Sequence, residues 1–144
     1  MTYEARKWLA RARSIEREID ALLSARKETR DRLTKITQSY SSDGAQTTKD
    51  PHKFDRLVEY ENLIDQKIDE QLAVKAEITK AIGMLQDGRQ RTVLTDYYIR
   101  IMSLEDTAVH LKYSYRQVKR FRAAGAAEIQ KILDAEKLAP NGPA

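Results

Sequence analysis

Hydrophobic residues in the first third of the chain recur at alternating steps of four and three positions. The series is Trp8, Ala12, Ile15, Ile19, Leu22, Arg26, Thr29, Leu33 and Ile36. This heptad spacing predicts one long helix over about residues 3–37, with a stripe that packs against another helix. Arg26 and Thr29 interrupt the stripe. We interpret them either as residues that set the register or the pairing of the helices, or as a stretch in which the helix is frayed.

A polar, turn-rich segment follows and predicts a mobile loop over residues 38–50. Asp50 and Pro51 are typical of an N-cap and of the first position of a second helix. Its stripe is Phe54, Leu57, Ile64, Ile68, Leu72, Ile78, Ile82 and Leu85, and it ends at Gln86-Asp87-Gly88. We therefore expect residues 1–87 to form a coiled-coil-like antiparallel hairpin, stabilised by mutual packing and by association with a second copy.

The pattern changes after Gly88 and predicts three shorter helices. The first covers residues 89–102, and Ser103 caps a second that runs through Leu111. A tight turn at Lys112 and Tyr113 precedes a capping-box pattern that begins at Ser114 and opens a final helix to about Leu133. We expect an all-α fold, with a helix-turn-helix domain over residues 88–138 after the hairpin. Residues 139–144 are rich in proline and glycine and predict a disordered tail.

The short helix and the final helix carry residues suited to DNA recognition. Ala108, Leu111, Val118 and Phe121 lie where the two helices must touch. The candidate DNA-binding residues are on the first turns of the final helix: Ser114, Tyr115, Arg116, Gln117, Lys119 and Arg120. Arg and Gln can bond base edges and Lys can neutralise phosphates. Residues 112–127 hold five basic residues and no acidic one, although a basic helix packed on the hairpin would have the same composition.

Charge and composition agree with this organisation. Residues 1–40 hold ten basic and six acidic residues, and residues 88–144 hold the same numbers. Residues 54–87 between them hold four basic and eight acidic residues. The two hairpin helices should attract each other, while the C-terminal domain keeps a positive charge for a partner. The absence of cysteine excludes disulfides and thiolate sites, and no signal peptide or membrane span is visible. We expect a cytoplasmic protein that does not enter a membrane.

No residue pattern predicts catalysis, a cofactor or a metal site. His52 and His110 lie far apart without a ligand partner at helical spacing, and both are expected at the surface. Paired carboxylates such as Asp69-Glu70 fit a solvated helix face better than acid–base chemistry. Five aromatic residues fall on helical stripes and are predicted to be core: Trp8, Phe54, Tyr97, Tyr98 and Phe121. Tyr115 is the one aromatic residue assigned to DNA.

Three stretches, Arg89-Gln-Arg-Thr-Val-Leu-Thr-Asp-Tyr-Tyr, Ser103-Leu-Glu-Asp-Thr-Ala-Val-His-Leu and Tyr113-Ser-Tyr-Arg-Gln-Val-Lys-Arg-Phe, resemble region 4 of sigma-70-type factors. With its hairpin, the chain is similar to the small phage-encoded late-gene regulators of the ArpU type. The resemblance implies that Tyr115, Arg116, Lys119 and Arg120 read promoter bases and phosphates. Three residues depart from the family pattern. Thr107 stands where an aliphatic residue is usual, and Gly125 interrupts the last helix. Lys112 stands in place of the turn glycine, and a glycine at such a position often marks positive φ.

The hypothesis from the sequence is a sequence-specific transcription regulator and not an enzyme. It would activate phage or prophage late genes in a bacterial host cell, bind double-stranded DNA as a homodimer, and have bacterial RNA polymerase as a candidate partner. One alternative is a small terminase-like subunit that recognises DNA for phage packaging. Another is an interaction protein whose hairpin binds a polymerase. A ring of eight or more copies would favour packaging, and a dimer would favour regulation.

Overall fold

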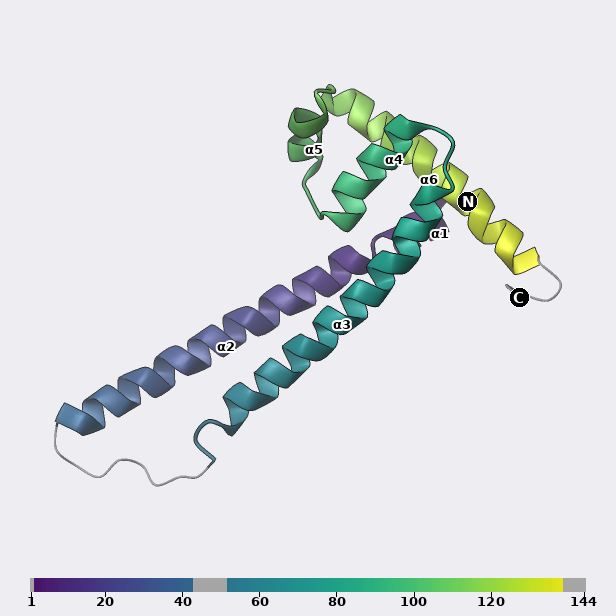
Figure 1. Ribbon diagram of the computed structural model, residues 1–144. Helices are drawn as coiled ribbons and strands as arrows, with labels where there is room; N and C mark the ends of the chain where they lie inside the picture. The colour runs from purple at the N-terminus through teal and green to yellow at the C-terminus, as the bar shows by residue number, and fades with distance from the viewer. Residues whose placement is uncertain (1, 43–51, 139–144) are drawn as a thin grey trace. The chain divides into compact units, whose positions relative to one another are not determined.

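The computed structural model describes residues 2–42 and 52–138, and every regular element in these residues is helical (Figure 1). The chain is all-α, as its periodicity predicts. In order, the elements are α1 (Thr2–Leu9), α2 (Arg11–Ser42), α3 (Asp55–Gly83), α4 (Gly88–Leu94), a π-helical turn η1 (Thr95–Ile99), α5 (Leu104–Leu111) and α6 (Tyr115–Leu138). Helix α2 extends to Ser42, so the loop predicted over residues 38–50 is wrong for residues 38–42, and the second long helix begins later than predicted, at Asp55. The predictions for residues 43–51 and 139–144 lie outside the described residues.

The chain forms two compact units. We call residues 15–71 the hairpin unit, and residues 1–14 together with 72–144 the head unit. The sequence placed the boundary between residues 87 and 88, whereas the structure places both ends of the hairpin in the head unit. The reason is packing, because Ala12 from α2 and Ile78, Ile82 and Leu85 from the α3 end of the hairpin join the core that contains α6.

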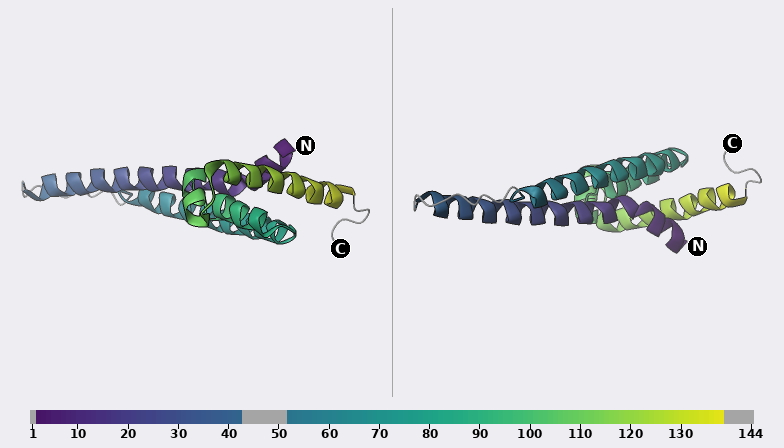
Figure 2. Two further views of the ribbon diagram at one scale, coloured as in Figure 1. Left: turned by 90° about the horizontal axis from the view of Figure 1, so that it is seen from above. Right: turned by 90° about the horizontal axis from the view of Figure 1, so that it is seen from below.

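In the hairpin unit, α2 and α3 run side by side (Figures 1 and 2). Ile15, Ile19 and Ile64 are buried between them. Two polar contacts lie nearby: Gln71 Nε2 donates to Glu16 Oε2 at 3.0 Å, and Lys67 Nζ lies 3.3 Å from Glu18 Oε2. Nearer the loop, Arg30 Nη2 is 4.0 Å from Glu61 Oε1. The hairpin therefore combines a small apolar core with polar contacts between the helices.

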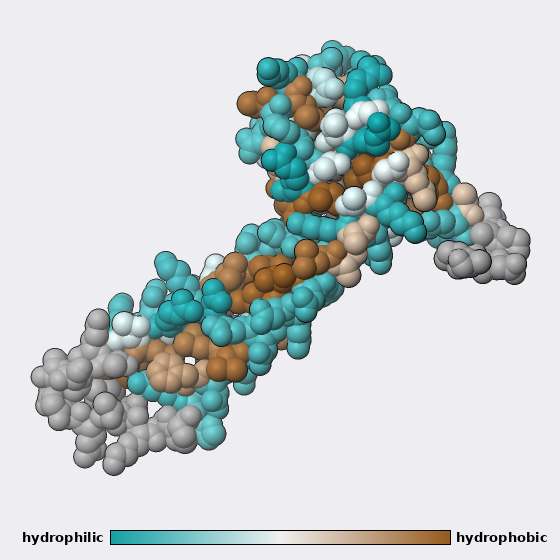
Figure 3. Space-filling model, in the orientation of Figure 1, coloured by the Kyte–Doolittle hydropathy of each residue, from teal (hydrophilic) through white to brown (hydrophobic). Residues whose placement is uncertain are grey.

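Several apolar residues of the hairpin unit remain exposed, and brown patches on its surface show this in Figure 3. Phe54 is 55% exposed, so its assignment to the core is wrong. Ile68 is also exposed, at 39%, although it belongs to the predicted stripe. Two members of the predicted stripe do pack inward: Ile64 is buried and Leu57 is half-buried. Gln71, which the stripe did not include, is also buried and continues their spacing of seven residues.

The core of the head unit surrounds α6, which contacts both α1 and α4. Leu9, Ile78, Leu94 and Ile129 are fully buried in it. Gly125, which interrupts the final helix in the sequence, allows close approach there: a Cβ at this position would lie 2.9 Å from Leu94 Cδ1. The helix continues through the glycine, and it ends at Leu138 and not near Leu133 as predicted.

The predicted first helix is bent at Ala10. Backbone bonds continue across the bend, since Ala10 N donates to Arg6 O at 2.9 Å. The side chain of Arg11 donates from Nε to Trp8 O at 2.9 Å and so satisfies a carbonyl at the bend. On the other side, the buried Ala5 N–H donates to Gln130 Oε1 at 2.9 Å. The bend thus lets α1 pack against α6.

The predicted helix over residues 89–102 is shorter than expected. Asp87 caps its start by accepting a bond from Arg89 N at 2.9 Å. After Leu94 the backbone widens into η1, and Arg100 N bonds to Thr95 O at 2.9 Å. Ile101 has φ 56°, which ends the helix before Met102.

Candidate nucleic-acid interface

Helix α5, a three-residue turn and α6 form the predicted helix-turn-helix arrangement. Ser103 caps α5, because its Oγ accepts a bond from Asp106 N at 3.0 Å. The acidic side chains of Glu105 and Asp106 lie in the first turn, where they suit the positive end of the helix. The sequence signal for this cap is confirmed.

The turn after α5 has the left-handed geometry that a glycine usually provides. Lys112 has φ 60° and ψ 39°, and Tyr113 N donates to Ala108 O at 3.0 Å. This bond closes a Schellman-type helix end. A lysine in this conformation costs about 1–2 kcal/mol relative to an unstrained backbone. Lys112 therefore adopts the positive φ that a glycine would adopt without strain, at this cost.

A capping box starts α6. Gln117 N donates to Ser114 Oγ at 3.1 Å, and Ser114 N donates to Gln117 Oε1 at 2.9 Å. The predicted box is confirmed. Gln117 Oε1 accepts one bond in the box, so Gln117 positions the helix start. The amide oxygen has a second lone pair, and the contact of Gln117 with DNA stays a prediction.

The two helices touch through the predicted residues. Ala108 and Val118 are buried in a cluster with Val93, while Leu111 and Phe121 pack against it half-buried. Thr107 is fully buried, and its Oγ1 donates to Ser103 O at 2.8 Å. Its hydroxyl is therefore satisfied within the helix. Val118 fixes which way α6 faces, and this orientation decides which of its residues meet solvent.

All six candidate DNA-binding residues are exposed: Ser114, Tyr115, Arg116, Gln117, Lys119 and Arg120. The Tyr115 side chain is 45% exposed, and Lys119 Nζ lies 5.6 Å from the centroid of its ring. Among the residues that the structure describes, neither Arg116 nor Arg120 forms an ion pair. The first two turns of α6 therefore present cationic side chains and one aromatic ring to solvent.

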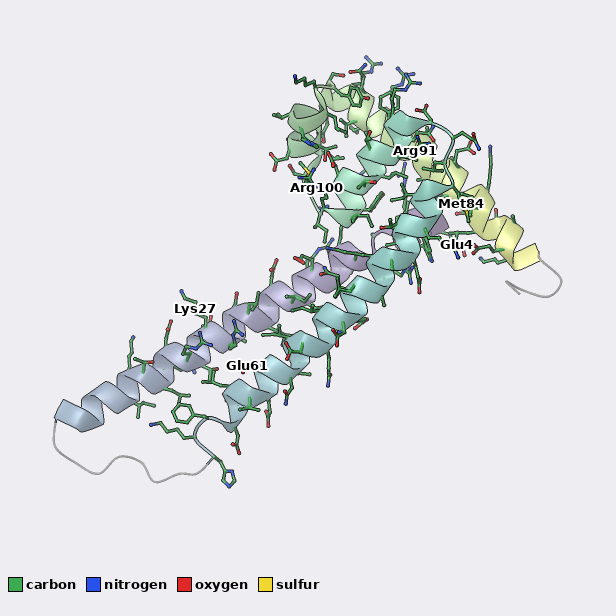
Figure 4. All side chains as sticks on the ribbon, in the orientation of Figure 1. Glu4, Lys27, Glu61, Met84, Arg91 and Arg100 are labelled. Atoms are coloured by element: carbon green, nitrogen blue, oxygen red, sulfur yellow. The ribbon has the colours of Figure 1, made fainter. Side chains whose placement is uncertain are left out.

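A buried carboxylate that the sequence analysis did not identify fastens α5 to η1. Asp96 is 4% exposed. Its Oδ2 lies 2.5 Å from His110 Nδ1, and its Oδ1 accepts from Arg100 Nη1 at 3.0 Å. Arg100 is labelled in Figure 4. Asp96 and Arg100 are four residues apart, a spacing that the sequence shows. His110 is fourteen residues away, and only the fold brings it here. It is exposed as predicted, but it also makes this contact.

An aromatic and cationic stack supports the same region from inside. The ring of Tyr97 lies between two guanidinium groups, with Arg13 Cζ 4.1 Å and Arg122 Cζ 5.0 Å from its centroid. Arg13 Nη1 also donates to Tyr97 O at 2.8 Å and to Met102 O at 3.1 Å. Burial raises the pKa of the neighbouring Tyr98 hydroxyl. Arg13 thereby ties the start of α2 to the backbone that leads into α5.

No protein-family model, curated protein or solved structure matches this chain. Its function is therefore inferred from its own residues.

Two further observations concern the described residues only. Within residues 2–42 and 52–138, no helix is long and apolar enough to cross a membrane. In the same part of the chain, no three or more His, Asp or Glu side chains gather in a way that could hold a metal ion.

Proposed function

We propose that this chain is a sequence-specific DNA-binding transcription regulator that inserts the start of α6 into a major groove. The observation that carries the proposal is the exposed set of Tyr115, Arg116, Lys119 and Arg120 on the first two turns of that helix. Residues 112–127 hold five basic residues and no acidic one, so no nearby acid in sequence neutralises the set. A helix that only packed against the rest of the chain would have no need of this excess.

The roles of these residues follow from their places on the helix. Arg116 is in the first turn, where a guanidinium can bond the O6 and N7 atoms of guanine. Lys119 and Arg120 lie one turn further and suit the flanking phosphates. Tyr115 offers its ring and hydroxyl beside them. Ser114 and Gln117 hold the end of the helix by the capping box.

The contacts around α6 favour a rigidly held DNA-contacting helix. Asp96 fastens α5, Gly125 lets α6 approach α4 closely, and α1 packs against α6. Groups that are held in place lose less entropy when they bind. The proposed activity is regulation of phage or prophage late genes by a homodimer, with RNA polymerase as a candidate second partner.

Binding of selected genomic DNA fragments tests the proposal. Arg116→Ala should weaken binding to the cognate site by roughly 1–3 kcal/mol and leave binding to scrambled DNA nearly unchanged. Lys119→Ala should weaken binding to both and lower the slope of log K against log salt by about 1. Lys131→Ala is the matched control, because this lysine is on the C-terminal half of α6 and pairs with Glu128 at 3.1 Å.

The outcomes separate the hypotheses. If Arg116→Ala and Lys119→Ala both bind the cognate site as tightly as the unaltered chain does, the start of α6 does not contact DNA. Native mass measurement then addresses the packaging hypothesis, since a ring of eight or more copies would contradict a dimeric regulator.

A further inference from the structure

The hairpin unit leaves more large apolar side chains exposed than it buries. Among residues 15–36 and 52–71, whose side chains the structure describes, three apolar residues are buried: Ile15, Ile19 and Ile64. Six large ones are exposed: Leu23, Ile36, Phe54, Val58, Leu63 and Ile68. Contiguous apolar surface on a protein marks a site where something else packs. A two-helix unit of this kind is poorly stabilised without a partner.

Heptad spacing shows that part of this set lies on one side of the hairpin. Ile68 is four residues after the buried Ile64, and Leu23 is four residues after the buried Ile19. Arg30 and Glu61 hold the same places one heptad nearer the loop, and the 4.0 Å contact between them bridges α2 and α3 on this side. Phe54, which lies seven residues before Glu61, immediately precedes the first residue of α3. We call Leu23, Arg30, Phe54, Glu61 and Ile68 the outer face.

Figure 4 shows Glu61 on the side of α3 that is turned toward α2. The outer face thus has apolar residues at both ends and an Arg–Glu pair between them. Leu63 is exposed at 44%, but its heptad place is on the opposite side of α3.

We propose that a second copy of this chain packs against the outer face and that the two hairpins form a four-helix bundle. Charge selects which helices meet. Residues 55–71 of α3 hold six acidic and two basic residues, whereas residues 15–36 of α2 hold five acidic and six basic ones. If α3 packed on α3 of the second copy, two acidic helices would face and repel each other. If α3 packs on α2 of the second copy, this repulsion does not arise.

A twofold axis along the hairpin produces the favoured arrangement. It places α2 of each copy over α3 of the other and makes the interface self-complementary. In this bundle, Leu23 of one copy lies near Ile68 of the other, and Arg30 near Glu61. The proposal concerns the hairpin unit and does not depend on DNA binding.

Sedimentation of the full chain tests the interface. The 16.6 kDa chain should sediment as a dimer. The double variant Leu23→Glu with Ile68→Glu should sediment as a monomer with unchanged helix content by circular dichroism, because both side chains are exposed. Leu63→Glu adds the same charge on the opposite side of α3 and should remain dimeric. A monomeric unaltered chain, or a double variant that keeps the dimer mass, overturns the proposal.

Crosslinking tests which helices meet, and the chain suits it because it contains no cysteine. Leu23→Cys and Ile68→Cys chains are prepared separately, mixed, and treated with a short bis-maleimide. The mixture should yield crosslinked dimers that contain one chain of each kind, and Leu23→Cys alone should yield few. Efficient crosslinking of Leu23→Cys alone, or of Ile68→Cys alone, would place like helices together and contradict the arrangement. If the unaltered chain sediments as a dimer but does not bind DNA, this result contradicts the proposed function and leaves the dimer interface standing.

Discussion

The head unit and the hairpin unit differ in how completely they bury their apolar residues. Among the described residues, the head unit buries fourteen apolar residues and exposes four large ones. The hairpin unit buries three and exposes six. The head unit encloses its core with its own helices, whereas the hairpin unit leaves a set of large apolar side chains exposed to solvent. The difference shows that burial is unevenly distributed along this one chain, and the exposed apolar residues of the hairpin unit are the reason for the second copy proposed above.

The largest expected effect is a cavity in the head core. Leu94 is fully buried, so Leu94→Ala should destabilise the head unit by about 2–5 kcal/mol. Leu22 is only half-buried in the hairpin unit, and Leu22→Ala should cost less. Trp8 is the only tryptophan and belongs to the head unit, so its fluorescence during urea unfolding reports this unit selectively. If the two variants lower the free energy of unfolding by equal amounts, the two units do not differ in how strongly their apolar residues stabilise them.

The next effect concerns close packing at Gly125. Alanine normally stabilises a helix relative to glycine by about 1 kcal/mol. At Gly125 the added Cβ would lie 2.9 Å from Leu94 Cδ1, so we expect Gly125→Ala to destabilise the head unit by roughly 1–2 kcal/mol instead. Gly83→Ala is the matched control, because no atom lies within 4 Å of its Cβ. Thermal unfolding of both variants checks the sign, and a stabilised Gly125→Ala chain would show that Leu94 moves aside easily.

Breaking the buried carboxylate contact should have a smaller and more local effect. His110→Ala removes one partner of Asp96, which is 4% exposed, and should cost about 1–3 kcal/mol. We expect faster hydrogen exchange in α5, with exchange in α2 of the hairpin unit unchanged. Val109→Ala is a control on the same helix, since Val109 is 79% exposed. Uniform exchange changes in both units would mean that the contact does not act locally.

The smallest effect concerns the cap of α4. The side chain of Arg89, and then its backbone N–H, lower the pKa of the Asp87 carboxyl below its ordinary value. A lowered folded-state pKa means that this contact stabilises the head unit above the unfolded-state pKa and is lost as pH falls through the folded-state pKa. Arg89→Ala should therefore move the Asp87 titration measured by NMR toward higher pH. An unmoved titration would show that Arg89 does not act on the carboxyl.

Local signals in the sequence predicted local features well. Ser103 and Ser114 cap α5 and α6 as their patterns indicate, because a cap depends on residues only three positions apart. The contact of Ala108 with Val118 follows from helical spacing on both sides of a short turn. The exposure of Arg116, Lys119 and Arg120 follows from the same spacing, since Val118 must face inward.

Features that depend on distant partners could not be read in the same way. The bend at Ala10 exists because α1 packs against α6, more than a hundred residues away. The contact of Asp96 with His110 depends on the widened turn η1, for which no sequence pattern was available. The predicted stripe of α3 contains both Ile64, which is buried, and Ile68, which is 39% exposed. Periodicity places these two residues on the same side of the helix, but it does not tell which of them contacts α2.

The contact between α1 and α6 has a consequence for the order in which the chain can fold during synthesis. Residues 1–14 leave the ribosome before the hairpin, but the helix that packs against Ala5 and Leu9 leaves it after the hairpin. The whole hairpin is translated between them, so the head unit cannot close until α6 has emerged. The hairpin unit, residues 15–71, is complete much earlier. The apolar side chains that the hairpin unit leaves exposed are therefore present on the nascent chain before the core of the head unit has formed.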